Sequence, residues 1–208
     1  MILHSDEFTS EFDVSRETLE RLDIYAELLK KWNPAINLVS KKTIDEVWSR
    51  HMLDSAQISK LVKKSDKHWV DLGSGGGFPG MVAAILATDI DESISFTLIE
   101  SDKRKSVFLR TVARETGVKV VVHDTRIEST PSQGADILTA RALAPLDDLL
   151  EYCELHLKPA GRAIFPKGMS YQQEIVDAEA RWDFSVQTIP SMTDAQAVLL
   201  EIKGISRV

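Results

Sequence analysis

The sequence predicts an α/β protein in which a Rossmann-like, doubly wound sheet follows a helical cap. From His68 onward, short β-branched or apolar runs alternate with helical segments, as in a parallel sheet with crossover helices. A glycine-rich loop follows the first of these runs. Helical periodicity alone occupies the first third of the chain, which is why we place a cap before the sheet.

The first long helix is expected to begin at Ser15, whose hydroxyl can accept a hydrogen bond from an amide of the first turn. Apolar residues then recur at helical spacing as far as Trp32. Asn33-Pro34 is expected to end the helix, because a residue before proline is driven out of the helical region.

A second helix is expected to begin at Thr43, with Glu46 completing a capping box, and to run towards Leu61. A polar connection follows it. We therefore assign residues 1–66 to the helical cap and 67–208 to the sheet domain, the two forming one compact unit.

The rest of the chain divides into expected strands and helices. Pro79 opens the expected helix 79–87, and Gly117 follows the expected helix 103–115. Both residues agree with the preferences of helix ends. The expected strands are 69–72, 95–100, 118–123, 135–140, 162–165, 184–189 and 197–202. The expected helices are 79–87, 103–115, 146–157 (ended by Pro159 and Gly161) and 171–181.

Composition favours a cytoplasmic globular protein. No apolar run approaches the roughly 18–20 residues of a membrane span. The first twelve residues include His4, Asp6, Glu7 and Glu11, and are unlike a signal peptide. The single cysteine, Cys153, suits a reducing compartment. The net charge of −7 counts against nucleic-acid binding over the whole surface, but leaves room for a local basic face.

The loop Asp71-Leu-Gly-Ser-Gly-Gly-Gly-Phe-Pro-Gly80 is the strongest functional signal. It follows a strand and leads into a helix, where glycines permit a tight turn and let a ligand reach the backbone. Glu100 ends the next strand, where its carboxylate can accept hydrogen bonds from ribose hydroxyls. Together they predict an adenosine-type site.

Two cofactors fit that site. Gly75-x-Gly77-x-x-Gly80 matches the dinucleotide fingerprint, so an NAD-dependent oxidoreductase is the alternative interpretation. Asp71 before the first glycine gives instead the acidic-x-Gly-x-Gly-x-Gly form of the S-adenosylmethionine loop. The late start of the following helix also suits a pyrophosphate poorly. We therefore favour S-adenosyl-L-methionine.

Several further segments resemble, in the same order, the RsmG (GidB) family of bacterial 16S rRNA guanine-N7 methyltransferases. The resemblance runs from about Trp32 to Gly168. Its motifs are Lys31-Trp32-Asn33, Asn37-Leu38, Arg50-His51-x-Leu53-Asp54-Ser55, the loop with Phe78-Pro79-Gly80, Ala140-Arg141-Ala142 and Pro166-Lys167-Gly168. It implies a class I methyltransferase fold with a seven-stranded, mostly parallel sheet. It also implies the bacterial cytoplasm and a target guanine in the 530 loop of 16S rRNA.

The resemblance also implies the cofactor-binding residues. Carried over by position, loop residues would contact the cofactor, two residues after the third strand would flank its adenine, and an arginine after the fourth strand would bind it. Glu100 stands where many family members have Asp and keeps the carboxylate. The full expected set is Gly73, Gly75, Phe78, Glu100, Ile127, Glu128 and Arg141.

Methylation at guanine N7 needs no general base, because N7 carries a lone pair and no proton. This fits a sequence without an evident nucleophile–base pair. The motif of exocyclic-amine methyltransferases is absent after the fourth strand, and Cys153 is interpreted as a packed thiol, not a nucleophile. Rate would come from holding N7 and the methyl group in line.

Arg141 is the candidate catalytic residue, as a donor to guanine O6 or a phosphate. A salt bridge to Asp136 or Asp71 is its alternative role. A basic rim at the crevice is expected to bind RNA, with a solvated charged face as the alternative. The candidates for that rim are Lys103, Arg104, Lys105, Arg126 and Lys167.

Other polar residues received weaker interpretations. His51 and Asp54 share a helix face, and we favour a structural role over a proton relay. Asn37 is expected to order the cap. The five histidines show no ligand spacing, so no metal is expected.

The expected partner is 16S rRNA or the small ribosomal subunit, and the protein is expected to be a monomer. A non-catalytic cofactor-binding module of a ribosome-assembly factor is the third hypothesis.

Overall fold

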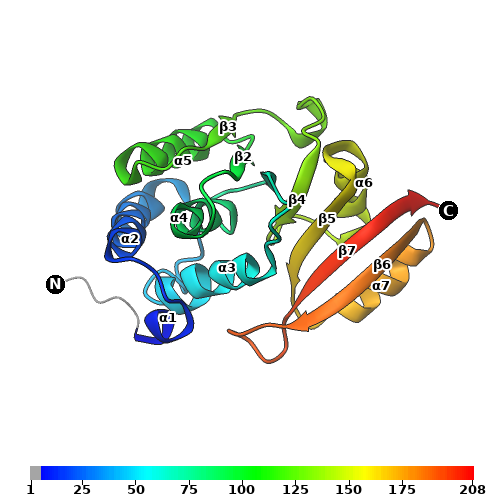
Figure 1. Ribbon diagram of the computed structural model, residues 1–208, viewed down its shortest axis with the longest axis horizontal. Helices are drawn as coiled ribbons and strands as arrows, with labels where there is room; N and C mark the ends of the chain where they lie inside the picture. The colour runs from blue at the N-terminus through cyan, green and yellow to red at the C-terminus, as the bar shows by residue number, and fades with distance from the viewer. Residues whose placement is uncertain (1–5) are drawn as a thin grey trace.

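The computed structural model describes residues 6–208 and contains one twisted sheet between two layers of helices (Figure 1). Within these residues the sheet has seven strands in the order β3-β2-β1-β4-β5-β7-β6. The first five strands along the chain are parallel, and β7 runs antiparallel to both β5 and β6. The strands are β1 (His68–Leu72), β2 (Ser95–Ile99), β3 (Val121–His123), β4 (Ala135–Ala140), β5 (Leu157–Lys167), β6 (Trp182–Pro190) and β7 (Val198–Arg207).

The strand order reverses at β1, which pairs with β2 on one side and β4 on the other. Leu72 is in register with both Ile99 and Ala140, so the loops that follow these three strands begin side by side. Open α/β sheets bind ligands in the crevice at such a switch point. The topology therefore brings the glycine loop, Glu100 and Arg141 to one edge.

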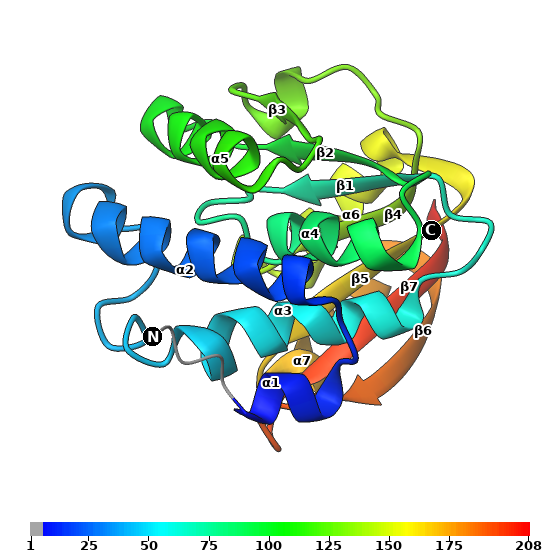
Figure 2. The same ribbon diagram turned by 60° about the vertical axis from the view of Figure 1, so that its left-hand side comes forward.

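The helices form two layers (Figure 2). Apolar residues of α1, α2, α4 and α5 share a cluster with one face of the sheet, and those of α6 and α7 pack on the other face. The helices are α1 (Asp6–Glu11), α2 (Arg16–Ile36), α3 (Asp54–Ala56), α4 (Gly80–Ile90), α5 (Lys103–Thr116), α6 (Leu146–His156) and α7 (Tyr171–Glu179). Because α2 packs on α4 and α5, it covers the two helices that follow β1 and β2, the strands beside the glycine loop.

Helix α2 begins as predicted but ends later. Ser15 caps it by accepting from the amide of Thr18 at 3.1 Å. Pro34 lies inside the last turn, so the prediction that Asn33-Pro34 ends the helix is wrong. Proline removes one backbone donor there, but the amide of Asn37 still bonds to the Asn33 carbonyl at 3.0 Å. Asn37 ends the helix in the left-handed conformation (φ 48°), which asparagine tolerates better than most residues.

The second helical segment begins later than predicted. Thr43 lies in a turn, and η1 (Trp48–Leu53) is a π-helix that continues into α3 and the 3-10 helix η2 (Gln57–Leu61). The capping-box prediction is wrong, because the Thr43 hydroxyl contacts His51 and the Ser40 carbonyl, not the start of a helix. π-Helical turns are frequent at functional sites, and this one carries His51.

Strand β5 is longer than the predicted residues 162–165 and includes Pro159 and Gly161. Its register with β4 shifts between Ala135 and Ile137, which accommodates the irregularity. A Cβ at Gly161 would lie 2.5 Å from the Ala135 carbonyl oxygen, so the glycine permits the close approach of the two strands. The remaining predicted elements agree within about three residues at either end, except that β7 extends to Arg207, beyond its predicted end at residue 202.

No helix among residues 6–208 is long and apolar enough to cross a membrane. The interpretation of the first twelve residues as unlike a signal peptide rests in part on residues 1–5, which lie outside the described residues. Residues 6–11, for which the sequence offered no motif, form α1.

Candidate active site

The glycine loop after β1 forms a turn that only small residues can adopt. Gly73 and Gly75 have φ values of 58° and 54°, in the left-handed region that glycine occupies without strain. A Cβ at Gly73 would lie 2.6 Å from the Leu143 side chain. The Ser74 amide donates to the Ile99 carbonyl at 3.1 Å, which joins the loop to the end of β2. At Gly73 and Gly75 the loop thus presents backbone, not side chains, to the crevice.

Asp71 lies beneath this loop, fully buried. Burial raises the pKa of its carboxyl to about 6, although the hydroxyl of Thr139 donates to it at 2.7 Å. A Cβ at Gly80 would lie 2.5 Å from the Asp71 Cβ, so Asp71 packs directly against the start of α4. The N-terminus of α4, where a dinucleotide pyrophosphate would bind, therefore faces a carboxyl group.

Glu100 closes the other side of the loop. Its carboxylate accepts hydrogen bonds from the amides of Gly75 at 2.8 Å and Asp102 at 2.7 Å, one on each oxygen. A carboxylate has about four acceptor positions, so each oxygen keeps a lone pair. Glu100 also lines a cavity of about 310 Å³, where these lone pairs can accept from a diol.

The small cavity also contains the residues expected beside an adenine. The 3-10 turn η3 (Ile127–Ser129) contributes Ile127 and Glu128 to its wall. His156 contacts the Ile127 carbonyl through Nε2 at 3.1 Å, and Tyr152 donates to the Glu128 carboxylate at 2.8 Å. The hydrogen bonds to its own amide and to Tyr152 lower the pKa of Glu128. The structure therefore brings together Gly73, Gly75, Glu100, Ile127 and Glu128.

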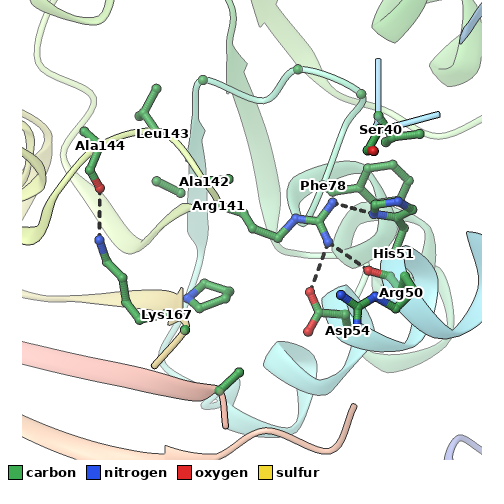
Figure 3. A pocket seen from close by; sticks show the side chains of 18 of the residues that line it. Ser40, Arg50, His51, Asp54, Phe78, Arg141, Ala142, Leu143, Ala144 and Lys167 are labelled. Carbon is green, nitrogen blue, oxygen red and sulfur yellow. Dashed lines mark hydrogen bonds and ion pairs between the residues drawn. The ribbon is translucent and has the colours of Figure 1, made fainter. Parts of the chain in front are cut away.

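A second, larger cleft of about 1160 Å³ adjoins the small cavity. The two share a wall made of the residues Gly73, Gly75, Lys105, Ala142 and Leu143. Phe78 and Arg141 line only the larger cleft (Figure 3). An elongated nucleoside with an amino-acid tail can therefore extend from the small cavity along the glycine loop into the larger one.

Arg141 projects from the loop after β4 into the larger cleft and is held from below. Its Nη1 donates to the Asp54 carboxylate at 3.0 Å and the Arg50 carbonyl at 3.3 Å. Its Nη2 donates to Nδ1 of His51 at 2.9 Å. Partners within residues 6–208 use three of its five N–H donors, which leaves two for a ligand. The expected alternative partners, Asp136 and Asp71, are not the ones it contacts.

The ring of Phe78 completes this arrangement. It stacks on Tyr25 with ring centroids 5.3 Å apart, and the Arg141 guanidinium lies 4.9 Å above its centroid. An aromatic face attracts a cation at this distance. The predicted cofactor contact Phe78 therefore also supports Arg141.

His51 is a neutral acceptor in this network. Because a guanidinium can only donate, Nδ1 must be unprotonated, and Nε2 then donates to the Thr43 hydroxyl at 2.8 Å. Thr43 in turn donates to the Ser40 carbonyl at 3.1 Å. Burial, then Arg141 and Arg50, lowers the pKa of His51 to about 3. His51 therefore orients Arg141 and is not poised to exchange a proton near neutral pH.

Comparison with known proteins shows the family of the chain. The profile of the GidB family, described as rRNA small subunit methyltransferase G, matches residues 18–200. The chain belongs to this methyltransferase family. A ribosomal RNA small subunit methyltransferase G from Ruegeria sp. (strain TM1040) is 52% identical over 95% of this chain and 96% of its own length. One from Paramagnetospirillum magneticum is 46% identical over 97% of this chain and 96% of its own.

Solved structures with the same fold are more distant. A ribosomal protein L11 methylase from Lactobacillus delbrueckii subsp. bulgaricus superposes with a TM-score of 0.57 at 19% identity, covering 74% of this chain and 76% of that one. A SAM-dependent methyltransferase from Aquifex aeolicus gives 0.55 at 12% identity, covering 85% and 96%. These likenesses confirm the predicted class I methyltransferase fold.

The cations expected on the rim of this methyltransferase differ in whether their charge is already paired with an acidic residue. Asp102 caps α5 by accepting from the amides of Arg104 and Lys105, and it pairs with the Arg104 guanidinium at 3.1 Å. The neighbouring Lys103 is exposed. The cap explains how a cationic first turn is tolerated, since an acidic residue at a helix N-terminus is favourable.

Three predicted cations line the cavities. Lys105 lines both and Arg126 the small one, and neither forms an ion pair with a described residue. Lys167 is different, because its side chain is only 9% exposed and its ammonium donates to the Ala144 carbonyl at 2.9 Å and pairs with Glu174 at 2.6 Å. Lys167 therefore joins the loop after β4 to α7 and presents no free charge.

Sequence reasoning missed several residues of the site. Tyr25 is among the residues at helical spacing before Trp32 and carries no motif, yet its hydroxyl donates to the Gly76 carbonyl. Thr193 and Asp194, between β6 and β7, line the larger cleft although no motif marks them. Leu143 contacts the glycine loop and divides the two cavities. Their roles arise from tertiary contacts over long sequence separations, which local patterns do not reveal.

Two expectations about chemistry can be compared with the structure. Among residues 6–208, no group of three or more His, Cys, Asp or Glu side chains is placed to hold a metal ion. Cys153 is buried in α6, and burial raises the pKa of its thiol well above its usual range. A buried protonated thiol is a packing residue, not a nucleophile.

Proposed function

We propose that this protein transfers the methyl group of S-adenosyl-L-methionine to N7 of a guanine in the 530 loop of 16S rRNA, in the cytoplasm and as a monomer. The observation that carries the proposal is the pair of joined cavities, one shaped for a nucleoside and one open at Arg141. Family membership supports the reaction class and the RNA. The 530 loop and the N7 atom follow from the resemblance of the motifs to the RsmG family.

The residues present fit S-adenosylmethionine. The positive φ values of Gly73 and Gly75 leave an open backbone wall, and Glu100 keeps acceptor lone pairs for ribose hydroxyls. Ile127 and Glu128 would flank the adenine, and the methionine part would lie towards the larger cleft. When bound, the cofactor supplies an activated methyl group. The proposed set is Gly73, Gly75, Phe78, Glu100, Ile127, Glu128 and Arg141.

The chain's own residues would contribute position, not proton transfer. Guanine N7 attacks with its own lone pair, so the reaction needs no base, and the neutral, internally bonded His51 provides none. The two remaining donors of Arg141 would bind guanine O6 or a neighbouring phosphate. Lys103, Lys105 and Arg126 would neutralise RNA phosphates at the rim, with Arg104 beside them.

The alternative, an NAD-dependent oxidoreductase, lacks support from the site. In a dinucleotide fold the pyrophosphate lies on the amides of the helix after the loop. In this chain Asp71 packs against that position, at Gly80. The carboxyl group at that position disfavours binding of a negatively charged pyrophosphate.

The deciding experiment maps N7-methylguanosine in small-subunit rRNA from cells with and without this protein, and after purified protein and cofactor are added back. We expect one guanine of the 530 loop to lose the mark and regain it. Unchanged methylation in its absence would contradict the proposal. Cofactor binding without methyl transfer to free 16S rRNA or to small subunits would point instead to a non-catalytic module.

Arg141→Ala tests the role of the arginine. We expect about 100-fold slower turnover, because a guanine held without this donor loses its alignment with the methyl group. The variant should still fold, with a somewhat lower unfolding midpoint, because His51 and Asp54 lose their donor. Arg110→Ala is the matched control, since Arg110 is exposed on α5 and pairs with Asp124 at 3.6 Å. The rate of methyl transfer under single-turnover conditions reports the effect. Equal rates for both variants would remove Arg141 from the mechanism.

A further inference from the structure

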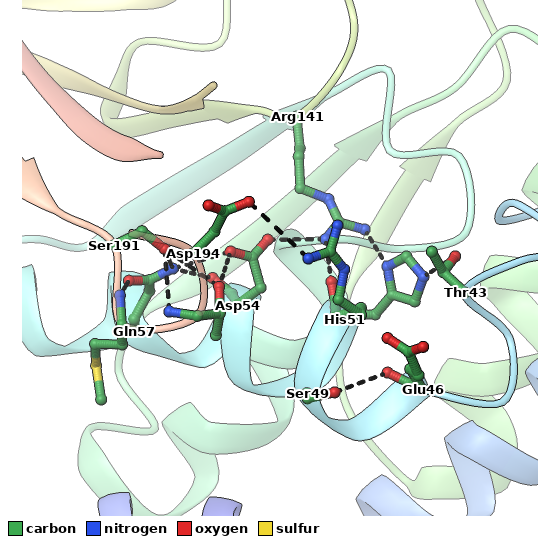
Figure 4. A network of polar contacts seen from close by, with 12 residues as sticks. Thr43, Glu46, Ser49, His51, Asp54, Gln57, Arg141, Ser191 and Asp194 are labelled. Atoms are coloured by element: carbon green, nitrogen blue, oxygen red, sulfur yellow. Dashed lines mark hydrogen bonds and ion pairs between the residues drawn. The ribbon is translucent and has the colours of Figure 1, made fainter. Parts of the chain in front are cut away.

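The tip between β6 and β7, residues 191–197, forms one wall of the larger cleft. Thr193, Asp194 and Ala197 line it, as do residues of the glycine loop. The tip contacts the cap segment that follows η1 (Figure 4). The C-terminal hairpin and the N-terminal cap therefore meet at the cleft.

Asp54 is the residue through which they meet. One of its oxygens, Oδ1, accepts from the Thr193 hydroxyl at 2.9 Å and from Nε2 of Gln57 at 3.0 Å. The other, Oδ2, accepts from Nη1 of Arg141 at 3.0 Å. A single carboxylate thus joins the hairpin tip to the arginine of the site.

Gln57 holds the same tip from beside Asp54. Its Oε1 accepts from the Met192 amide at 2.9 Å, and its Nε2 also donates to the Ser191 hydroxyl at 3.3 Å. Gln57 is 3% exposed, so water does not replace these bonds readily. Buried polar networks of this kind hold their members in one arrangement.

We propose that Asp54 is a positioning residue that sets the orientation of Arg141 according to where the hairpin tip lies. The carboxylate is planar and rigid, so a shift of Thr193 on Oδ1 turns Oδ2 and the guanidinium bonded to it. Asp54 also lines the larger cleft, and in this proposal it acts on the reaction through Arg141. The inference rests on the proposed function for its effect on rate, but its structural content is independent of that function.

Thr193→Val tests the coupling, because valine keeps the shape and removes the hydroxyl. We expect the maximal rate of methyl transfer to fall about fivefold, the effect of losing one hydrogen bond. The affinity for S-adenosylmethionine should change little, and the unfolding midpoint should fall by no more than the loss of one hydrogen bond accounts for. Thr193→Ser, which keeps the hydroxyl, should recover most of the rate. Ser185→Ala is the control, because it removes a hydroxyl bond of the same hairpin outside the cleft.

A second background separates coupling from direct contact with RNA. If Thr193 acts through Arg141, adding Thr193→Val to Arg141→Ala should slow the reaction no further, because alanine leaves no cation to pair with Asp54 Oδ2. A further fivefold loss in that background would show that Thr193 acts directly, and an unchanged rate for Thr193→Val alone would show no effect. Either result overturns the proposal.

A readout without methylation distinguishes this inference from the proposed function. In protein labelled with ¹⁵N-arginine, the side-chain signal of Arg141 is the one that Arg141→Lys removes. We expect Thr193→Val to shift or broaden that signal and Ser185→Ala to leave it in place. A signal insensitive to Thr193→Val would overturn the coupling even in an active enzyme. A sensitive signal in an inactive protein would contradict only the proposed function.

Discussion

His51 shows how a single side chain couples the site to pH. Its pKa in the folded protein is about 3, below the ordinary value of 6.5, first because of burial and then because of Arg141 and Arg50. Between these values the unfolded chain binds more protons than the folded one. Stability attributable to His51 is therefore present at neutral pH and falls as the pH decreases through this window.

We predict that His51→Gln flattens this dependence, since glutamine offers an acceptor and a donor but does not titrate. The free energy of unfolding, measured with denaturant from about pH 7 to about pH 5, should fall less steeply in the variant. The shifted His68 and His156 remain in both proteins, so their contribution cancels. Equal slopes would mean that His51 is not held neutral by this network.

Glu100 is a second residue whose role follows from its partners. Both amides that it contacts are donors, and the side-chain NH₂ of a glutamine cannot accept from either. We predict that Glu100→Gln weakens S-adenosylmethionine binding about tenfold or more, as expected for loss of a hydrogen bond to a charged group. Glu100→Asp, which keeps the carboxylate, should cost less. Titration calorimetry measures both, and equal affinities for the two variants would contradict the assignment.

For single residues, the sequence predicts which side chains belong to the site better than it predicts which residues they contact. Glu100 was predicted because an acidic residue at the end of the strand after the glycine loop suits a ribose, and Arg141 was predicted through the resemblance of Ala140-Arg141-Ala142 to the family motif. The partner of Arg141 was not, because Asp54 lies 87 residues away and only the docking of the cap brings it close. Thr193 was missed for the same reason, since it contacts Asp54 from a position 139 residues away in the sequence.

Among the elements, α2 acts as a support for the glycine loop. Tyr25, in its middle, is fully buried, stacks on Phe78 and donates its hydroxyl to the Gly76 carbonyl. We predict that Tyr25→Phe costs about 1–3 kcal/mol in unfolding free energy, because it leaves a buried acceptor without its donor, and weakens cofactor binding. The matched control is Tyr171→Phe in α7, whose hydroxyl bonds to no described residue. Equal stability of the two variants would contradict this role for α2.

The elements themselves were predictable where local chemistry decides them. Ser15 caps α2 and Gly117 ends α5 in the left-handed conformation, as their residue types indicate. Pro34 was misjudged because a proline near a helix end removes only one bond, which tertiary packing can offset. Thr43 was misjudged because its hydroxyl, which could cap a helix, bonds instead to His51, eight residues further along the chain.

Over the whole molecule, an acidic protein must bind a polyanion. The chain carries a net charge of −7. Several cations that line the larger cleft are neutralised by neighbours: Arg141 by Asp54, Lys167 by Glu174 and, at 4.0 Å, Arg50 by Asp194. Lys105 and Arg126 form no ion pair with a described residue, so they are the cations best placed to replace counterions on RNA.

We predict that Lys105→Gln and Arg126→Gln each weaken binding of 16S rRNA and reduce the slope of log affinity against log salt concentration by about 1. Lys64→Gln is the control, because Lys64 is exposed in the connection before β1, and the glycine loop follows the other end of that strand. Lys167→Gln should leave the slope nearly unchanged, since its charge is already paired, although it frees the Glu174 carboxylate near the cleft. Equal slopes for Lys105→Gln and Lys64→Gln would place the RNA elsewhere on the surface. A larger effect of Lys167→Gln than of Lys105→Gln would mean that the Lys167–Glu174 pair opens when RNA binds.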